Sequence, residues 1–519
     1  MTYLCVPIFV TDEAQARREI ATAAEAGADL VELRIDEFEG DPSKMVDHSI
    51  VPTVLTYRAE WEGGRSQVSD AQRAEVLTFN AHLANHTDVE LETLRRTGTK
   101  REEFGSSVIV SFHDFKGRPD RLYNILTEMD SVGANVRKIV WMARSIRDNL
   151  EAFEILQQRG TPTIALCMGE AGIISRVLAK KFGAFLTFAS LRDESATAPG
   201  QVTIHDMKRL YRWDAINENT KVYGVVAQPV MHSMSPAIHN AAFERVGHDG
   251  VYLPMLVNAG YESFKAFMES FLAFEPLHLS GLSVTLPHKE NALRYLKEKG
   301  AEVEDLAERI GAVNTIIIER TGGRLTSARS VEPSLRGINT DYAAILDSIT
   351  DKLGITREHL KDYRVAVIGA GGTGRTAVAA LAHYGATVVV YNRTFERAEE
   401  LAKEFNGHSG KVVAARMEKL CDSCCQIYIN TTSVGMHPKV DESPFGDTPP
   451  KFTSDTVVFD TIYNPMKTKL LQHAEQSGAK TIGGVEMFVR QAAAQFEAWT
   501  NKPAHRELMR QTIEARLQK

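Results

Sequence analysis

The stretch that decides the fold is Leu30-Val31-Glu32-Leu33-Arg34-Ile35-Asp36, in which charged and apolar side chains alternate from Val31 onward. In a β-strand, side chains two residues apart share a face, so Glu32, Arg34 and Asp36 would lie on one side. Strands of parallel sheets are normally apolar on both faces, and a charged face therefore needs a polar place to point. The lumen of a closed barrel provides that place, whereas the alternative is an exposed edge strand.

The same alternation recurs in the strands that surround this stretch. Its polar members there are Asp88, Glu90, Glu92, Ser111, His113, Thr56 and Arg58. Four such strands in series favour one charged cavity over repeated edge strands. Short apolar runs also alternate with helical patterns every 20 to 30 residues or so, which is typical of βα units. The predicted strands are 4–10, 30–36, 52–57, 88–92, 108–113, 138–142, 162–166 and 184–189. Eight βα units predict a (β/α)8 barrel.

Length and composition set the remaining limits. A chain of 519 residues is long enough for roughly three to four domains. The net charge is −7 and no basic tract stands out, which argues against a nucleic-acid or membrane partner and favours small molecules. No apolar run reaches the ~18 residues that span a bilayer, and a strand-like run begins at Leu4. We therefore expect a cytoplasmic protein, or a plastid stromal one if a transit peptide has been removed.

The cysteines do not predict a disulfide framework or a metal site. The chain has five of them, and Cys421, Cys424 and Cys425 lie close together. No second ligand pair follows at zinc-site spacing, so we interpret these three as packing side chains and expect no metal.

A dinucleotide-binding signature occupies the second half of the chain. An apolar run at 364–368 leads into Gly369-Ala370-Gly371-Gly372-Thr373-Gly374, followed by a helical segment at 375–384 and a second strand at 387–391. The glycine loop between a strand and a helix lets the main chain approach a pyrophosphate at the helix N-terminus. We therefore predict that Gly369, Gly371, Gly372 and Gly374 bind a dinucleotide.

The residues after the second strand indicate which nucleotide binds. An NAD enzyme usually has Asp or Glu there, but this chain has Asn392, Arg393 and Thr394, followed by Arg397. Two guanidinium groups suit a 2′-phosphate, so NADP(H) is predicted. The alternative is a solvated helix start with Thr394 as its N-cap.

These observations predict an α/β protein with three parts. The barrel is assigned to residues 1–217, because the polar stretch 217–220 precedes a new apolar strand. Residues 221–335 form a compact α/β domain onto which the C-terminal helices at 487–519 are expected to pack. Residues 336–486 form a Rossmann domain.

The first half resembles the type I 3-dehydroquinate dehydratases. The motifs that carry the resemblance are Val31-Glu32-Leu33-Arg34-Ile35-Asp36, Thr56-Tyr57-Arg58, Glu62-Gly63-Gly64, Ser111-Phe112-His113-Asp114-Phe115, Lys138-Ile139-Val140, Gly172-Ile173-Ile174-Ser175-Arg176 and Thr197-Ala198-Pro199-Gly200-Gln201. The resemblance implies dehydration of 3-dehydroquinate through a Schiff base on Lys138. Taken alone, Lys138 would be a strand-start residue with its amine in water.

The same resemblance implies roles for other barrel residues. His113 is the expected general acid and base, supported by Glu62. Arg176 binds the substrate carboxylate. The residues implied to hold ring hydroxyls are Glu32, Arg34 and Arg58, and those on a closing loop are Thr197 and Gln201. One conflict remains. Lys138 is the first residue of its predicted strand, whereas the catalytic residues of (β/α)8 barrels lie at the carboxyl ends of the strands. A strand that begins near Asn135 would reduce this conflict.

The second half resembles the shikimate dehydrogenases from about residue 222 to residue 517. The motifs are His232-Ser233-Met234-Ser235-Pro236, Val284-Thr285-Leu286-Pro287-His288-Lys289, Gly311-Ala312-Val313-Asn314-Thr315, Gly337-Ile338-Asn339-Thr340-Asp341, Asn430-Thr431-Thr432-Ser433, Ile462-Tyr463-Asn464-Pro465 and Gln491, besides the glycine loop and Asn392-Arg393-Thr394. The resemblance implies that Lys289 donates a proton and Asp341 orients it. Their alternative is a structural salt bridge.

The implied substrate ligands of this half fall into two sets. Those for the carboxylate are Ser233, Ser235, Thr285 and Tyr463, and those for hydroxyls are Asn314 and Gln491. Hydroxyls at both serine positions favour shikimate over quinate, although the serines could instead cap a helix near Pro236. Ser283 departs from the family's pattern, since many single-domain dehydrogenases have asparagine there.

Together the halves resemble a fused shikimate-pathway enzyme. The implied lyase converts 3-dehydroquinate to 3-dehydroshikimate, and the implied oxidoreductase reduces this to shikimate with NADPH. Two alternatives stay open: a non-catalytic regulator, which should have lost Lys138, His113, Lys289 or Asp341, and a quinate dehydrogenase fused to a dehydratase.

Overall fold

The computed structural model describes residues 1–519 apart from 48, 196, 321–331, 408, 447–449 and 519. It divides into two compact units. The first contains Met1–Pro236 and Asp249–Leu279, and the second contains Ala237–His248 and Ser280–Lys519.

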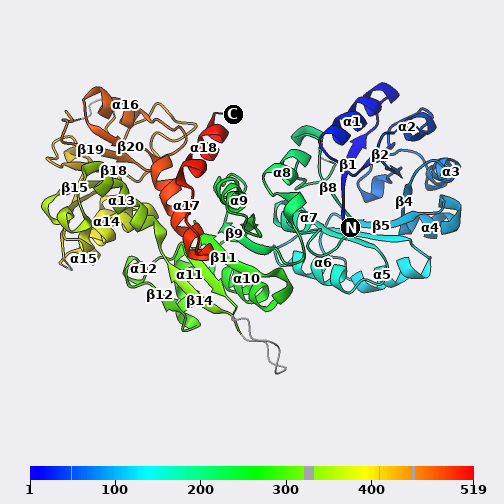
Figure 1. Ribbon diagram of the computed structural model, residues 1–519, viewed down its shortest axis with the longest axis horizontal. Coiled ribbons are helices and arrows are strands. Elements are labelled where there is room, and N and C mark those ends of the chain that lie inside the picture. Colours follow the sequence, from blue (N-terminus) through cyan, green and yellow to red (C-terminus); the bar gives the residue numbers. More distant parts are fainter. Residues whose placement is uncertain (48, 196, 321–331, 408, 447–449, 519) are drawn as a thin grey trace. The chain divides into compact units, whose positions relative to one another are not determined.

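The first unit is built around a parallel barrel (Figure 1, blue to cyan). Within the described residues, its eight-stranded sheet has the order β7-β6-β5-β4-β3-β2-β1-β8. The Phe185 amide, just before β8, donates to the Thr163 carbonyl in β7 at 2.8 Å and closes the ring. The strands are β1 (Tyr3–Phe9), β2 (Leu30–Arg34), β3 (Thr53–Thr56), β4 (His86–Glu90), β5 (Val108–Asp114), β6 (Val136–Met142), β7 (Thr163–Met168) and β8 (Leu186–Phe188). The predicted (β/α)8 fold is confirmed.

The bounds of the barrel strands differ from the prediction by one or more residues, and three of these differences change where a singled-out residue lies. β2 ends at Arg34, so Asp36 lies in the turn that follows it. β4 ends at Glu90, so Glu92 lies on the next helix, where its carboxylate binds Arg95 and Arg96. Arg58 follows β3, in agreement with a predicted strand that ended at residue 57. β6 begins at Val136, so Lys138 is its third residue. Alternation alone cannot show where a strand ends when a helix follows at once, which explains the error at Glu92.

Helices follow the strands and lie outside them. α1 begins after Asp12, whose side chain accepts from the Gln15 amide, and α3 begins with a capping box formed by Ser69 and Gln72. The helices of the barrel are α1 (Glu13–Glu25), α2 (Ser43–Asp47), α3 (Asp70–Asn80), α4 (Leu91–Thr97), α5 (Leu122–Ser131), α6 (Asp148–Gln157), α7 (Ile173–Val177) and α8 (Ile204–Arg209).

Beyond the barrel, two parallel strands complete the sheet elements of the first unit. β9 (Lys221–Ala227) pairs with β10 (Gly250–Leu256), which helix α10 (Tyr261–Ala273) follows. Helix α9 (Ser235–Arg245) begins in this unit.

The second unit opens with a mixed sheet. β13 (Thr315–Glu319) lies antiparallel to both β11 (Leu279–Val284) and β14 (Ser334–Ile338), and β14 pairs in parallel with β12 (Glu302–Val303). The helices here are α11 (Lys289–Glu298) and α12 (Asp305–Ile310).

The remainder of this unit consists of the predicted Rossmann domain and of the C-terminal helices that follow it. Over its described part, the parallel sheet has the order β17-β16-β15-β18-β19-β20. The strands are β15 (Arg364–Ile368), β16 (Thr387–Tyr391), β17 (Lys411–Ala415), β18 (Ile427–Asn430), β19 (Val457–Asp460) and β20 (Lys480–Ile482). The helices are α13 (Thr340–Leu353), α14 (Gly372–His383), α15 (Phe395–Phe405), α16 (Lys469–Gln476), α17 (Gly484–Thr500) and α18 (Arg506–Leu517). The apolar strands β15 and β18 are buried at its centre.

Candidate active sites

One cavity inside the barrel brings together the nine barrel residues to which the family resemblance gave roles. The predicted residues that line it are Glu32, Arg34, Arg58, Glu62, His113, Lys138, Arg176, Thr197 and Gln201. The polar faces of β2, β5 and β6 therefore point into the lumen, as the alternation in these strands predicted.

Lys138 is held among carboxylates. Its Nζ donates to Asp88 Oδ2 at 2.8 Å and lies 3.3 Å from Glu32 Oε1, and its ammonium group packs 4.5 Å from the centre of the Phe188 ring. The residue is only 3% exposed. The amine is thus fixed in the cavity by strands β2 and β4.

His113 and Glu62 form a proton-sharing pair. The distance from His113 Nδ1 to Glu62 Oε2 is 2.8 Å. Burial, aided by the positive charges of Arg58 and Lys138, lowers the pKa of His113 well below its usual value. Burial also raises the pKa of Glu62 well above its usual value. Both shifts disfavour charge on the pair, so the two groups share one proton and can pass it to or from a ligand.

Arg58 organises acids that the predicted set of site residues did not include. It donates to Asp88 Oδ1 at 2.7 Å, to Glu90 Oε1 at 3.1 Å and to Ser111 Oγ at 2.7 Å. Although burial opposes ionisation, Arg58 and Lys138 hold the pKa of Asp88 well below its ordinary value. The alternating polar pattern pointed to Asp88 and Glu90, but their partners depend on register between strands.

Arg34 and the loop residues have simpler surroundings. Arg34 makes a bidentate pair with Asp36, at 3.1 and 2.6 Å. Thr197 and Gln201 bond to each other, the Thr197 amide donating to Gln201 Oε1 at 2.8 Å. The last two residues line the cavity from the segment after β8.

Arg176 differs from the other cations of the cavity. It is 1% exposed, and its Nε and Nη2 atoms have no hydrogen-bond partner in the part of the chain that the structure describes. Burial lowers its pKa to about 10. A buried guanidinium with open donors is complementary to a carboxylate.

The second unit contains the predicted lysine–aspartate pair. Lys289, the first residue of α11, places its Nζ 2.6 Å from Oδ2 of Asp341 in the first turn of α13. Asn339 caps α13 by accepting from the Asp341 amide at 3.0 Å, and its Nδ2 donates to the Ala312 carbonyl at 3.0 Å. The cap fixes the aspartate relative to the lysine.

The predicted polar ligands of this half are in separate surroundings. Asn314 is buried; its Nδ2 donates to Thr340 Oγ1, and its Oδ1 accepts from Thr315 Oγ1 at 2.7 Å. Tyr463 packs against Phe488, with ring centres 5.1 Å apart, and burial raises its pKa.

Gln491 donates to the Phe488 carbonyl at 3.1 Å, and Thr285 is half-buried just after β11. Ser233 and Ser235 belong to the first unit, where Ser233 Oγ accepts from the Ser235 amide at the start of α9. Ser283, the departure from the family pattern, donates to Gln495 Oε1 at 2.8 Å.

The glycine loop has the space that a bound dinucleotide requires. Gly369 has a φ of +111°, and a Cβ atom at Gly374 would lie 2.1 Å from the Gly369 carbonyl oxygen. These positions therefore exclude side chains, and Gly371 and Gly372 start α14 with open space around them. Asn392 Oδ1 accepts from the Ala370 amide at 3.1 Å and fixes the loop. The loop fits a pyrophosphate at the helix N-terminus.

Arginines follow the two strands next to β15, namely β16 and β17. Arg393 and Arg397 are exposed, as is Thr394. Sequence analysis missed Arg416, which follows β17 directly and lies 4.6 Å from the centre of the Phe395 ring. Because Tyr391 pairs with Ala415, Arg416 reaches the same sheet edge as Asn392. An arginine directly after the next strand was the available signal.

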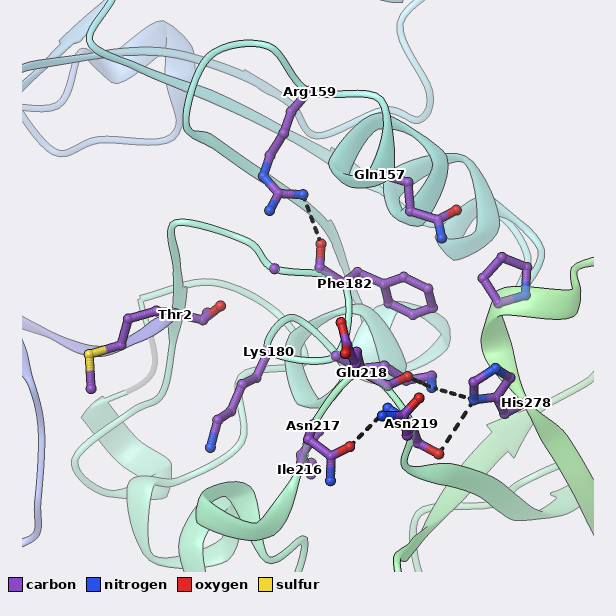
Figure 2. Close-up of a pocket in the computed structure, with 14 residues that line it drawn as sticks. Thr2, Gln157, Arg159, Lys180, Phe182, Ile216, Asn217, Glu218, Asn219 and His278 are labelled. Carbon is purple, nitrogen blue, oxygen red and sulfur yellow. Dashed lines mark hydrogen bonds between the residues drawn. The ribbon is translucent and has the colours of Figure 1, made fainter.

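A larger cavity in the first unit, of about 790 Å³, contains none of the predicted site residues. Figure 2 shows Arg159, Lys180 and His278 around it. Its cations donate to main-chain carbonyls: Arg159 to Phe182 and Lys180 to Asp214, at 3.2 and 2.9 Å. These side chains bind the protein itself.

The three clustered cysteines only partly match their interpretation. Cys425 is buried, and burial raises its pKa, as expected for a packing side chain. Cys421 and Cys424 are exposed, contrary to that interpretation, because they precede β18 in an irregular segment. Within the described ranges, His, Cys, Asp and Glu do not form a group that could hold a metal.

The fold, the barrel cavity around Lys138 and the Lys289–Asp341 pair define a class of protein. It is an enzyme in which a (β/α)8 barrel precedes a dinucleotide-binding dehydrogenase. The sequence profile of the type I 3-dehydroquinase family matches residues 4–218. Profiles of the shikimate dehydrogenase substrate binding domain, the shikimate / quinate 5-dehydrogenases and the shikimate 5′-dehydrogenase C-terminal domain match residues 225–316, 352–463 and 484–514.

Whole-chain similarity identifies the family. A chloroplastic bifunctional 3-dehydroquinate dehydratase/shikimate dehydrogenase of Arabidopsis thaliana is 37% identical over 97% of this chain and 83% of its own length. An NADP(+) shikimate dehydrogenase of Methanosarcina acetivorans is 38% identical over 57% of this chain and 99% of its own length. A crystal structure of the Thermus thermophilus enzyme with NADP(H) and shikimate is 31% identical, covers 57% of this chain and 99% of that one, and has a TM-score of 0.46. This chain belongs to the family of bifunctional 3-dehydroquinate dehydratases/shikimate dehydrogenases.

Proposed function

We propose that the two halves catalyse consecutive steps of the shikimate pathway. The barrel removes water from 3-dehydroquinate, and the second half reduces the resulting 3-dehydroshikimate to shikimate with NADPH. The observation that carries the proposal is the single barrel cavity in which Lys138, the Glu62–His113 pair and the open donors of Arg176 meet. An amine, a proton carrier and a carboxylate ligand are what an imine-based dehydration of a keto acid needs.

In the barrel, Lys138 gives up its ammonium proton to His113 and attacks the substrate ketone as a neutral amine; the carbinolamine hydroxyl then takes a proton from His113 and leaves as water, which forms an iminium ion. The iminium withdraws electrons and makes the adjacent C–H bond acidic. His113 removes that proton and returns one to the leaving hydroxyl, and Glu62 orients the imidazole through its contact with Nδ1. Hydrolysis of the imine then releases the enone and restores the amine.

Substrate binding in the barrel is divided among the other cavity residues. Arg176 holds the carboxylate, and Thr197 and Gln201 cover the ring. The residues proposed to contact ring hydroxyls are Glu32, Arg34 and Arg58. Arg58 also keeps Asp88 ionised, and the Asp88 carboxylate holds the Lys138 side chain in the cavity.

In the second half, NADPH supplies the hydride that reduces the ketone. Lys289 donates a proton to the developing alkoxide, and Asp341 orients the lysine. The residues proposed to hold the substrate carboxylate are Ser233, Ser235, Thr285 and Tyr463, and those proposed to hold its hydroxyls are Asn314 and Gln491. The serine assignments rest on the sequence resemblance alone.

The cofactor is proposed to bind at the glycine loop through Gly369, Gly371, Gly372 and Gly374. Its 2′-phosphate meets the edge residues Asn392, Arg393, Thr394 and Arg397. The NADP-dependent relatives and the NADP(H) complex of the Thermus enzyme support this cofactor. The open space around Gly371 and Gly372 at the start of α14 also supports a ligand there.

We further propose domain limits of 1–217 for the dehydratase, 221–335 with 487–519 for the substrate domain, and 336–486 for the Rossmann domain. Trp499 on α17, which donates to the Ile316 carbonyl at 3.1 Å, supports the return of the C-terminal helices. No described helix is long and apolar enough to cross a membrane. The proposed location is the cytoplasm, or the plastid stroma if a transit peptide has been removed.

One coupled assay tests the proposal. 3-Dehydroquinate is added with NADPH, and loss of the nicotinamide absorbance is followed; we expect oxidation to match the dehydroquinate supplied. Parallel reactions run in reverse, with shikimate or quinate and with NADP+ or NAD+, separate shikimate from quinate specificity. Oxidation with 3-dehydroshikimate alone would restrict the activity to the second half, and no oxidation with either substrate would reject both steps.

A further inference from the structure

A buried chain of ion pairs links helix α3 to the barrel lysine. Its outer end is Arg73, which is 1% exposed and does not line the substrate cavity. Arg73 Nη1 donates to the Tyr57 carbonyl at 2.9 Å and to Glu90 Oε2 at 3.0 Å, and its Nη2 donates to Asp70 Oδ1 at 2.7 Å. The sequence offered no signal for this residue, because a helical arginine is usually solvated.

Glu90 joins Arg73 to the cavity. Its Oε2 accepts from Arg73 and from Thr93 Oγ1, at 3.0 and 2.7 Å, whereas its Oε1 accepts from Arg58 at 3.1 Å. Arg58 continues the chain to Asp88, whose other oxygen receives the Lys138 ammonium. Every link is buried, so these charges interact with little screening by solvent.

Acids outnumber cations slightly in this network. The groups that face the Glu62–His113 pair or its partners are the acids Glu32, Asp70, Asp88 and Glu90, the cations Arg58, Arg73, Lys138 and Arg176, and the ion pair of Arg34 with Asp36. Asp70 is partly exposed and also pairs with Arg96, so solvent screens its charge more than that of the buried groups. Among the buried groups other than Arg176 and the Arg34–Asp36 pair, three cations face three acids and Glu62, and one proton on the Glu62–His113 pair balances their charge.

We propose that Arg73 is a positioning residue for dehydration: acting through Glu90 and Arg58, its charge sets the pH range in which the Glu62–His113 pair and Lys138 react. This inference rests on the proposed dehydratase function. Arg73 touches neither the cavity nor the reacting groups, so its effect is electrostatic. A cluster that loses this charge holds protons more tightly.

The test is the pH profile of dehydration in the full chain, with each rate normalised to the reductase rate of the same preparation. Arg73→Gln should move the acid limb of kcat/KM to higher pH by roughly one unit, the size expected for a buried unit charge at about 10 Å. Glu90→Gln removes the opposite charge and should move the limb to lower pH. Arg73→Lys keeps the charge, so the limb should stay in place while kcat falls.

A matched control is Arg137→Gln. Arg137 is also a buried barrel arginine, but it donates to Asp130 and Thr163 and does not line the cavity. The acid limb of kcat/KM for dehydration in Arg137→Gln should coincide with that of the parent protein. The expected shifts of the acid limb have opposite signs in Arg73→Gln and Glu90→Gln, which separates an effect of charge from general damage to the fold. If one of these variants does not fold, the direction of the shift in the other still tests the proposal.

Coincident profiles in a parent that dehydrates 3-dehydroquinate would overturn the role of Arg73 and leave the proposed function intact. Shifts of the same sign in Arg73→Gln and Glu90→Gln would overturn it as well. If the parent itself does not dehydrate, the proposed function fails first, and this inference fails with it.

Discussion

Arg176→Met should stabilise the barrel while it disables dehydration. Burial lowers the pKa of Arg176 from its ordinary value to about 10, and at 1.36 kcal/mol per pKa unit this corresponds to roughly 3 kcal/mol. A base whose folded pKa lies below its unfolded value destabilises the fold at all pH values below the lower one, so the full cost is present at pH 7. Methionine retains an apolar chain in the buried site and removes the charge.

The same substitution removes the proposed carboxylate ligand. Nε and Nη2 would each make a charge-assisted bond worth about 1.5–3 kcal/mol, so kcat/KM for 3-dehydroquinate should fall by about 10²- to 10⁴-fold. Stability is read from hydrogen exchange of peptides in β6 and β7, which reports on the barrel alone. Initial dehydration rates give kcat/KM.

Arg137→Met is the matched control for stability. Arg137 is buried like Arg176, but its guanidinium already donates to Asp130 and Thr163, so its removal should speed exchange in β6 and β7. We expect slower exchange in Arg176→Met than in the parent. Equal acceleration in both variants, or a loss of kcat/KM below tenfold in Arg176→Met, would refute the reasoning about an uncompensated charge.

Three further predictions address the remaining groups. Borohydride added with 3-dehydroquinate should attach a substrate-sized mass to Lys138, as found by peptide mass spectrometry, and an unmodified lysine would remove the imine step. Arg393→Asp should weaken NADPH much more than NADH in titrations, since a carboxylate repels the 2′-phosphate; equal losses would argue against that contact. Lys289→Ala should abolish ketone reduction and leave dehydration at the parent rate, and a parallel fall of both rates in a folded protein would contradict two separate sites.

The strands were predictable because of where their side chains lie. A strand of a parallel barrel has one face against the helices and one face in the lumen. Apolar side chains therefore alternate with polar ones along the strand, and this pattern can be recognised in the sequence. The short strand–glycine–strand unit at 364–391 was predictable for a similar reason, since only glycine tolerates the contact between Gly374 and the Gly369 carbonyl.

Other features depend on geometry between elements and left no local signal. Glu92 continued the alternation of β4 although the chain had already turned into α4. Arg73 reaches the cavity network from a helix, and Asp88 meets Lys138 only because their strands are two apart in the barrel order. Arg416 did leave a signal, an arginine directly after a strand, but its place at the same sheet edge as Asn392 depends on the pairing of β16 with β17. Such contacts are set by register, which a single sequence does not state.

The two sites differ in how many charged groups they bury, and the difference follows from the reactions proposed for them. Ketone reduction builds up negative charge on the substrate at one atom, the oxygen, which one lysine held by Asp341 at 2.6 Å can neutralise by proton transfer. Imine-based dehydration changes charge repeatedly, as the amine becomes an iminium and protons pass to and from His113. Each of these states must be stabilised within the same dry cavity, and fixed charges already in place avoid reorganisation at every step. The extended ion-pair network around Lys138 is therefore better explained by the number of charge changes in the reaction than by stability, because buried ion pairs are a weak source of stability.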